Sequence, residues 1–535
     1  MESDRYKDRS EIARTQKSFV GRFFLLLLST VFLAGQVFAQ AKSPQLLEAT
    51  IAEVQSKLLS RELSCKDVVS YYKERIEAYD SASGANAISQ INPQLMQRAE
   101  QLDELLRDSN TQPQLFCVPL LIKDNFDTFD MPTTGGSIAL RDSFPSDDAT
   151  VIARLRQEGA IVLAKTNMAE WAFSPRQTVS STHGRTANAY DVNFVPAGSS
   201  GGTASGVAAN FGLAGMGSDT GNSIRGPSSH LALVGIRPTI GLISREGVIP
   251  LIFDRDVVGP MARSVGDAVR LLNVIAGHDS ADALSVPGKR EPDYRQFLKD
   301  NGLKGKRLGV LSALVEQAGA DPEIRRLFDQ AILDLRSAGA TVIESVDIAD
   351  FARLNDEIPY CGRFRYDMKN YLKTLPAPPF LDVNSVLETG EIANESLDAF
   401  NFYAEYPLDV APDDWEESCP TWPNHPLRNE LLANANSLML EQSLDALIYP
   451  SWANPPAPID EANQLYRGDN NQRLVPDAGL PAITVPMGFW QDSLPAGIQF
   501  VGAPFSEGIL IEIAKGYEYT TGHRRPPAGF GELSP

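Results

Sequence analysis

A glycine-rich segment at residues 198–247 constrains the fold of this 535-residue chain more than any other feature, because it contains 12 glycines. Ordinary helices and strands disfavour glycine, so this density indicates tight turns, positive φ angles and close approaches between backbones. Two loops here also carry serines, AGSSGG at 197–202 and SDTGNSIRG at 218–226. Their N–H groups can converge on a phosphate or an oxyanion, although glycine turns with helix-capping serines are the simpler interpretation.

Helical and strand-like patterns alternate before this segment. Residues 64–80 begin with a capping serine and place apolar residues on one helical face. The apolar stretch 118–124 predicts a buried strand. Asp148 is expected to cap a helix that ends at Gly159, and residues 160–165 predict the next strand. This alternation predicts an α/β fold.

The C-terminal half divides into two parts. Residues 285–420 combine Pro-rich patches, helical stretches and many acids, and we interpret them as a peripheral insertion or cap. Strand-like patterns return at 446–450, 480–489 and 496–502, and a helical pattern follows at 508–519. The chain contains no internal repeat and no low-complexity tract.

The first 39 residues have the pattern of a secretory signal peptide. Residues 1–22 carry six bases and four acids, and the apolar run Phe23–Leu33 follows them. The small-residue segment ending at Ala39 then predicts cleavage near that residue. An uncleaved anchor is the alternative, because the apolar stretch is just under the usual spanning length of about 20 residues.

Charge and cysteine spacing exclude several functions. The chain has 68 acids and 48 bases, a net charge of −20, which opposes nucleic-acid binding. Its cysteines are widely scattered and form no CxxC pair or Cys/His cluster, so we expect no metal site. The spacings do not say which cysteines would pair in an oxidising compartment.

The segment 198–202 formally matches GxSxG, the nucleophile elbow of α/β-hydrolases. That motif follows directly on a strand, whereas the preceding residues DVNFVPA contain a proline. It also needs a downstream catalytic histidine. Four histidines follow, and none has a recognisable catalytic context: His230, His278, His425 and His523. We therefore disfavour Ser200 as a nucleophile.

Without a histidine, a serine nucleophile needs another base. A buried lysine can serve, because burial disfavours its ammonium form. Lys123 follows the apolar run VPLLI, and Lys165 follows the similar run AIVLA. These grounds alone do not choose between the two lysines.

The motifs of the chain closely resemble those of the amidase signature family. They occur in the order VPLLIKDNFDT, TTGGSIAL, DATVIARLRQEGAIVLAKTNMAEWA, VPAGSSGGTASGVAAN, GSDTGNSIRGPS, GIRPTIGLISREGVIPL and VVGPMARSVGDAVRLLNVIAG. The similarity runs from about residue 45 to 277 and resumes at GLPAITVPMGF and PAGIQFVGAP. It implies a single large α/β domain over residues 40–535, with a mixed central sheet flanked by helices. Residues 285–440 vary within the family and would be peripheral or belong to the substrate pocket.

The resemblance also implies a Ser-cisSer-Lys triad. By motif position, Lys123 is the base, Ser199 lies in a cis peptide, and Ser223 is the nucleophile. Lys165 falls on the KTN motif and is not the triad lysine. Neutral Lys123 would take a proton from Ser199, which takes one from Ser223 as it attacks the amide carbonyl. No metal or organic cofactor is required.

The family pattern further implies an oxyanion hole made by the backbone N–H groups of Thr220, Gly221, Asn222 and Ser223. Asn222 stands where the family usually has a second glycine, and Ala197 where the other serine loop usually begins with glycine. Asparagine tolerates a left-handed backbone, so we expect the loop to keep its form while the side chain narrows the acyl pocket. We expect Asp219 and Arg225 to pair and support this loop.

These features predict a secreted or periplasmic amidase that hydrolyses a carboxamide or peptide-like amide to a carboxylic acid plus ammonia or an amine. One alternative is a protein like the glutamine-hydrolysing subunit of an amidotransferase, which the signal peptide opposes because its partners are cytosolic. Another is an inactive binding protein on the same fold, which the presence of all three triad residues opposes. No nucleic acid and no stable membrane insertion after cleavage are expected. The oligomeric state stays open, a homodimer included.

Overall fold

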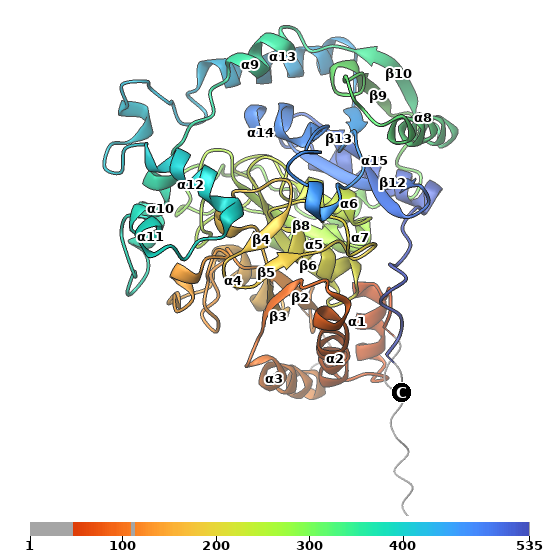
Figure 1. The fold of residues 1–535 in the computed structure, drawn as a ribbon. Helices are drawn as coiled ribbons and strands as arrows, with labels where there is room; N and C mark the ends of the chain where they lie inside the picture. Colours follow the sequence, from red (N-terminus) through yellow and green to blue (C-terminus); the bar gives the residue numbers. More distant parts are fainter. Residues whose placement is uncertain (1–45, 109–112, 534–535) are drawn as a thin grey trace, which may run out of the picture. The chain divides into compact units, whose positions relative to one another are not determined.

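Eleven strands form one mixed sheet (Figure 1) in the computed structural model, which describes residues 46–108 and 113–533. The predicted signal peptide, residues 1–39, lies outside the described residues. In spatial order the strands are β1 (Ile88–Ile91), β3 (Ile161–Thr166), β2 (Pro119–Lys123), β6 (Ala214–Asp219), β8 (Val257–Ala262), β7 (Val234–Arg237), β12 (Ala482–Trp490), β13 (Leu494–Val501), β11 (Ala446–Pro450), β9 (Arg307–Leu311) and β10 (Thr341–Val346). The predicted α/β class with a mixed central sheet is confirmed.

Strand direction brings the ends of β2 and β6 together. These strands are parallel, with Ile122 opposite Met216, so Lys123 ends β2 close to the end of β6. Strand β8 runs antiparallel to β6, and its first residue, Val257, lies opposite Asp219. The carboxyl ends of β2 and β6 and the start of β8 therefore meet at one edge of the sheet. In open α/β sheets, such an edge is where ligands bind.

Helices pack against this sheet, and several hold the strands that form the edge. Helix α5 packs on β2 and β6, α6 on β13, α7 on β8, and α15 on β12. Within the described residues, no helix combines the length and the apolarity needed to cross a bilayer. The helices are α1 (Ile51–Leu59), α2 (Cys65–Ser83), α3 (Leu95–Asp108), α4 (Thr150–Gln157), α5 (Gly201–Ala208), α6 (Arg225–His230), α7 (Val265–Ile275), α8 (Pro322–Ser337), α9 (Phe351–Glu357), α10 (Phe364–Leu372), α11 (Asn384–Thr389), α12 (Leu397–Ala404), α13 (Pro426–Glu441), α14 (Leu474–Ala478) and α15 (Glu507–Thr521).

The first predicted helix begins as expected, and the second does not. Ser64 caps α2 and forms a reciprocal capping box with Asp67. Helix α4, in contrast, has Ala149 at its N-cap with no side-chain cap. The expectation that Asp148 caps this helix is wrong, because its carboxylate instead pairs with Arg156 at 3.0 Å.

The interpretation of residues 285–420 as a peripheral cap is only partly right. Strands β9 and β10 extend the central sheet beyond β11, and α8 packs on both β10 and β11. The sequence pattern of β10 is weak because this edge strand exposes residues such as Thr341 and Glu344. Helices α10, α11 and α12 do form a cap beside the sheet (Figure 1), with a separate apolar cluster that includes Trp171 and Phe364.

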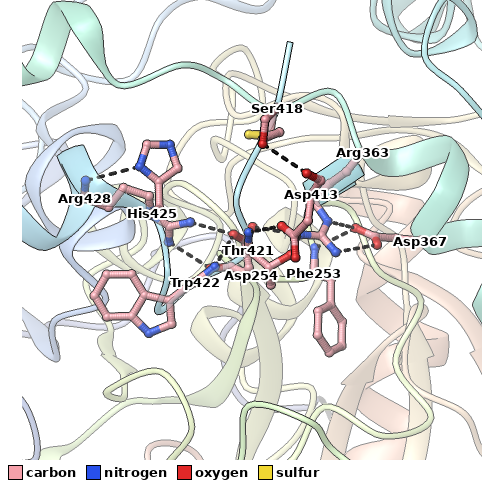
Figure 2. Close-up of a disulfide and its surroundings, with 12 residues drawn as sticks. Phe253, Asp254, Arg363, Asp367, Asp413, Ser418, Thr421, Trp422, His425 and Arg428 are labelled. Atoms are coloured by element: carbon pink, nitrogen blue, oxygen red, sulfur yellow. Dashed lines mark hydrogen bonds and ion pairs between the residues drawn. A yellow bond between two sulfur atoms is a disulfide. The ribbon is translucent and has the colours of Figure 1, made fainter. Parts of the chain in front are cut away.

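All four cysteines form disulfides, a pairing that their spacing did not reveal. Cys65 pairs with Cys117, which joins the start of α2 to the residues before β2. Cys361 pairs with Cys419, 58 residues later, and so closes the loop that contains the cap helices. Figure 2 shows this second disulfide with the ion pairs around it.

Candidate active site

Lys123 is fully buried at the end of β2 and faces two serines. Its Nζ lies 2.7 Å from Ser199 Oγ and 2.8 Å from Ser218 Oγ. Burial lowers the pKa of Lys123 to about 7, against the opposing effect of Asp219 and Asp256. A substantial fraction of this lysine is therefore a neutral amine near neutral pH, and such an amine can accept a proton from one serine while donating to the other.

Lys165 has a different environment, although it is equally buried. Its Nζ donates to Phe126 O at 2.7 Å and Thr133 Oγ1 at 3.2 Å, and it lies 3.3 Å from Asp124 Oδ1. It thus joins the end of β3 to the loop after β2. These contacts indicate a structural role for Lys165. Of the two lysines, only Lys123 lies beside the serine loops.

The first serine loop places Ser199 directly before α5. The Gly198–Ser199 peptide bond is cis, at the position that the resemblance implied. Ser199 is fully buried, and its Oγ contacts Lys123. Ala197, just before it, has a φ of 63°, so the loop contains a left-handed residue where the family usually has glycine.

The second loop joins β6 to α6 and carries Ser223. Ser223 is 5% exposed and lines a cavity of about 210 Å³. The carbonyl of Pro175 connects the two serine loops, because it accepts from Gly198 N at 3.1 Å and from Asn222 Nδ2 at 3.1 Å. The loops that carry Ser199 and Ser223 are therefore held against the same segment.

The predicted oxyanion donors all line the cavity beside Ser223. Within the described part of the chain, their backbone N–H groups donate no hydrogen bond, so they are available to a ligand. Four free donors at one cavity wall can stabilise a negatively charged oxygen, and losing one such donor costs about 3 kcal/mol in other serine hydrolases. These residues are Thr220, Gly221, Asn222 and Ser223.

Asp219 and Arg225 pair as expected, with a second arginine that the sequence did not reveal. The Asp219 carboxylate lies 3.1 Å from Arg225 Nε and 2.7 Å from Arg237 Nη1, and all three side chains are buried. Burial alone would raise the pKa of Asp219, but the two guanidinium groups outweigh it and hold the pKa well below its usual range. Arg225 also donates to Gly221 O at 2.6 Å, so this ion cluster supports the oxyanion loop.

Asn222 does not need its tolerance for a left-handed backbone, since its φ is not positive. Its side chain fits for another reason: Nδ2 donates to Pro175 O and, at 2.9 Å, to Asp469 Oδ2. These bonds hold the loop against two neighbouring segments. Asn222 lines the cavity; that its side chain narrows the acyl pocket stays a prediction.

Two further site residues were missed in the sequence. Ser218 lies in the SDTGNS motif and contacts Lys123, but the motif alone does not show where its side chain points. Asp256 lies just before β8; it accepts from Thr220 Oγ1 at 2.5 Å and from Leu251 N at 2.8 Å. Asp256 therefore ties the oxyanion loop to the pocket wall.

A larger cavity of about 330 Å³ adjoins the site and shares Ala172, Thr220 and Leu251 with the smaller one. Asn125 and Ser218 line it at the end near Lys123, and the mainly apolar segment 248–251 forms one wall. Tyr366 and other residues of α10 form another wall. Residues of the variable region 285–440 therefore line this cavity, and their part in binding a substrate stays a prediction.

The α/β-hydrolase alternative finds no support in the geometry. Ser200 is buried and its Oγ donates to Ser218 O at 3.2 Å. Among the described residues, no histidine contacts Ser200. Each of the four downstream histidines has other surroundings: His230 stacks on Trp452, His278 lies beside Ser285, His425 accepts from Arg428 N (Figure 2), and His523 lies near Asp334.

The mixed sheet carries a buried lysine and two serine loops at one edge. This arrangement is typical of a class of enzymes that hydrolyse amides. The sequence profile of the Amidase family matches residues 67–511. The chain therefore belongs to the amidase signature family and is a hydrolase that acts on C–N amide bonds.

Relatives match over nearly the whole chain. A probable amidase of Arabidopsis thaliana is 33% identical over 502 residues, which cover 90% of this chain and 91% of that protein. A glutamyl-tRNA(Gln) amidotransferase subunit from a Cyanothece species is 32% identical, with coverage of 90% and 99%. The crystal structure of the peptide amidase from Stenotrophomonas maltophilia has a TM-score of 0.79 at 32% identity, again covering 90% and 99%.

We expect Gly221→Ala to lower kcat by about 10²–10³-fold, comparable to the loss of an oxyanion donor. The new Cβ would overlap Gln472 Oε1, so either the Gln472 side chain or the loop must shift, and a shift of the loop moves its N–H groups. Steady-state kinetics of the folded variant measure this loss, and adding Gln472→Ala should recover part of it by restoring space. Gly266→Ala on α7 is the matched control, because its Cβ meets only Ser264 Oγ at 3.8 Å. Wild-type kcat in Gly221→Ala would contradict the expectation that the loop, and not the Gln472 side chain, shifts.

Proposed function

We propose that this protein is an amidase that hydrolyses a small carboxamide or peptide-like amide through an acyl-enzyme on Ser223. The contact of buried Lys123 with Ser199 carries the proposal, because it joins a neutral base to a serine hydroxyl. No other described lysine combines burial with contacts to two serine hydroxyls.

The contact of Lys123 with Ser199 supplies the first step of the proton path. Among the described residues, Ser223 Oγ donates to Asn222 Oδ1 at 3.4 Å, so the second step requires this hydroxyl to turn toward Ser199. Neutral Lys123 takes the proton of Ser199 while its own N–H group donates to Ser218. Ser199 then takes the proton of Ser223 as Ser223 Oγ attacks the amide carbonyl. The free N–H groups of residues 220–223 stabilise the resulting oxyanion.

Collapse of the tetrahedral intermediate breaks the C–N bond. The proton on Lys123 returns through Ser199 to the leaving nitrogen, which departs as ammonia or an amine. Water then attacks the ester of Ser223 with the same relay as base, and the carboxylic acid leaves. The two reactions consume one amide and one water, and they restore all three residues.

Two observations support a peptide-like substrate. The peptide amidase of Stenotrophomonas maltophilia is similar over nearly its whole length. In addition, the two cavities beside Ser223 have volumes of about 330 and 210 Å³, which suit groups on both sides of an amide.

A panel of amides tests the proposed function. Ammonia or amine release is measured from N-acyl amino-acid amides, a dipeptide amide, simple aliphatic amides and free glutamine. We expect hydrolysis of the peptide-like or aliphatic amides to exceed that of glutamine. Preferential glutamine hydrolysis would favour the amidotransferase alternative instead, and no hydrolysis of any amide would favour an inactive binding protein.

We further propose that the protein is exported and that the signal peptide is removed. The leader pattern supports this, and so do the Cys65–Cys117 and Cys361–Cys419 disulfides, because disulfides persist mainly in oxidising compartments. We expect protein recovered outside the cytoplasm to begin near Gln40, as N-terminal sequencing would show. A full-length cytosolic chain that begins at Met1 would contradict export and reopen the amidotransferase alternative.

A further inference from the structure

The two cavities beside Ser223 differ in character. The larger one has a mainly apolar wall at residues 248–251 and carries charges of both signs. We call the smaller one, lined by the oxyanion loop on one side, the polar compartment. Its remaining wall consists of Ala172, Phe173, Pro175, Leu251, Arg255, Tyr360 and Gln472. The guanidinium of Arg255 is the one formally charged group among these lining residues.

Arg255 is buried, but its hydrogen-bonding capacity is not used up. The residue is 9% exposed, and its Nη2 donates to Gln472 O at 3.2 Å and lies 3.2 Å from Asp477 Oδ1. Among the described residues, neither its Nε nor its Nη1 has a hydrogen-bond partner, and of the two only Nε is fully enclosed by protein atoms. Nη1 is therefore the nitrogen that can donate to an acceptor of a ligand in the polar compartment.

The position of Arg255 is fixed from both sides. Its carbonyl accepts from Arg237 Nη2 at 2.8 Å. The preceding Asp254 accepts from Arg428 Nη1 at 2.8 Å and from Trp422 N at 3.0 Å, close to the second disulfide (Figure 2). These bonds fix the backbone at Arg255, and the contacts of Nη2 with Gln472 O and Asp477 hold its guanidinium. A guanidinium held in this way loses little entropy when it binds a ligand.

The same disulfide lies next to Tyr360, the lining residue that packs against Arg255. Tyr360 lines the polar compartment and directly precedes Cys361, which pairs with Cys419. The Arg255 guanidinium lies 5.5 Å from the centre of the Tyr360 ring, and Tyr360 Oη bonds Tyr403 Oη at 2.7 Å. Arg255 and Tyr360 therefore pack against each other and together line the compartment that also contains the nucleophile.

We propose that Arg255 is a specificity-determining residue that donates a hydrogen bond to an oxygen acceptor of the substrate near the scissile amide. This inference rests on the proposed amidase function. The acceptor is a carboxylate or a carbonyl oxygen: both are planar acceptors that a guanidinium binds, whereas a cationic substituent would be repelled. Asp477 neutralises part of the positive charge of Arg255. The guanidinium can therefore bind either a neutral carbonyl or a negatively charged carboxylate.

Three amides of matched length test this inference. Glutaramic acid carries a carboxylate, 5-oxohexanamide a ketone carbonyl, and hexanamide neither. The measured quantity is the ratio of kcat/KM for each acceptor-bearing amide to that for hexanamide. In Arg255→Met we expect at least one ratio to fall by about 10–100-fold, the usual effect of losing a hydrogen bond to a charged group. The acceptor with the larger fall identifies the carboxylate or the carbonyl as the preferred group.

Controls separate this role from a structural one. Because each ratio comes from one enzyme preparation, partial unfolding cancels, and Arg255→Gln gives the same comparison should Arg255→Met fail to fold. Arg176→Met removes a nearby positive charge that lies over Tyr466, outside the polar compartment, and should leave the ratios unchanged. Unchanged ratios in a folded Arg255 variant would overturn the inference. Failure of the wild-type enzyme on all amides, including the wider panel, would instead contradict the proposed function.

Discussion

Replacing Ser223 by alanine is expected to lower kcat by roughly 10⁶-fold, the loss seen when the serine nucleophile is removed from another hydrolase. Ser223 lies in the loop whose backbone N–H groups are free to bind an oxyanion. Among the described residues, it is the one serine that lines the cavity beside this loop. Removing Oγ leaves the protein without an atom to form the acyl-enzyme. The measurement is steady-state amide hydrolysis by the purified variant, with its melting temperature as a check of folding.

Two neighbouring serines provide the comparison for Ser223→Ala. Ser199→Ala should also slow hydrolysis strongly, because it breaks the proton path between Lys123 and Ser223. Ser200→Ala should retain most activity, since its hydroxyl only donates to the carbonyl of Ser218. A folded Ser223→Ala variant with near wild-type kcat, or a Ser200→Ala variant that is equally inactive, would contradict the assignment of the nucleophile.

Lys123→Met should lower kcat/KM by roughly 10²–10⁴-fold, the usual contribution of a positioned base. The neutral amine is the active form of Lys123, and burial lowers its pKa to about 7. Activity of the wild-type enzyme should therefore be low below this pKa, rise as pH increases through about 7, and level off above it. In Lys123→Met this rise should disappear. A pH series of kcat/KM on a neutral amide measures both effects.

Lys165→Met is the matched control for this experiment. It removes a second buried lysine of equal length, but one that donates to Phe126 O and Thr133 Oγ1 away from the serines. We expect it to lower the melting temperature while the folded fraction keeps the wild-type pH profile. Loss of the pH-dependent rise in Lys165→Met, or its persistence in Lys123→Met, would show that the base is misassigned.

Local sequence patterns predicted the elements that form the edge of the sheet. The apolar run before Lys123 became β2, and the run around Lys165 became β3, because continuous burial imposes a continuous apolar sequence. The capping serine and acid predicted the start of α2 for a similarly local reason. The weak pattern of β10 hid it, because an edge strand does not need an apolar residue at every second position.

Residue patterns alone do not decide which of the two lysines is the catalytic base. Lys123 and Lys165 both follow buried strands, and only the neighbouring loops distinguish a base facing serines from a lysine bound to carbonyls. The family resemblance pointed to Lys123, at the position where the structure places the serine loops.

Other features depend on contacts between distant segments. Ser218 contacts Lys123 from another strand, and Arg237 reaches Asp219 across the sheet. Asn222 is held by Asp469, 247 residues later. The disulfide pairs were equally hidden, because the spacing of four scattered cysteines does not determine which of them meet in space.

The most direct test of the account is covalent labelling with a serine-reactive fluorophosphonate, followed by mapping of the modified peptide. We predict a single label on Ser223, within the segment GSDTGNSIR, that Ser223→Ala abolishes and Ser199→Ala slows strongly. Replacing each histidine in turn should leave labelling largely intact. A label on Ser200, or its loss when His425 or His523 is replaced in an otherwise folded protein, would contradict the triad of Lys123, Ser199 and Ser223.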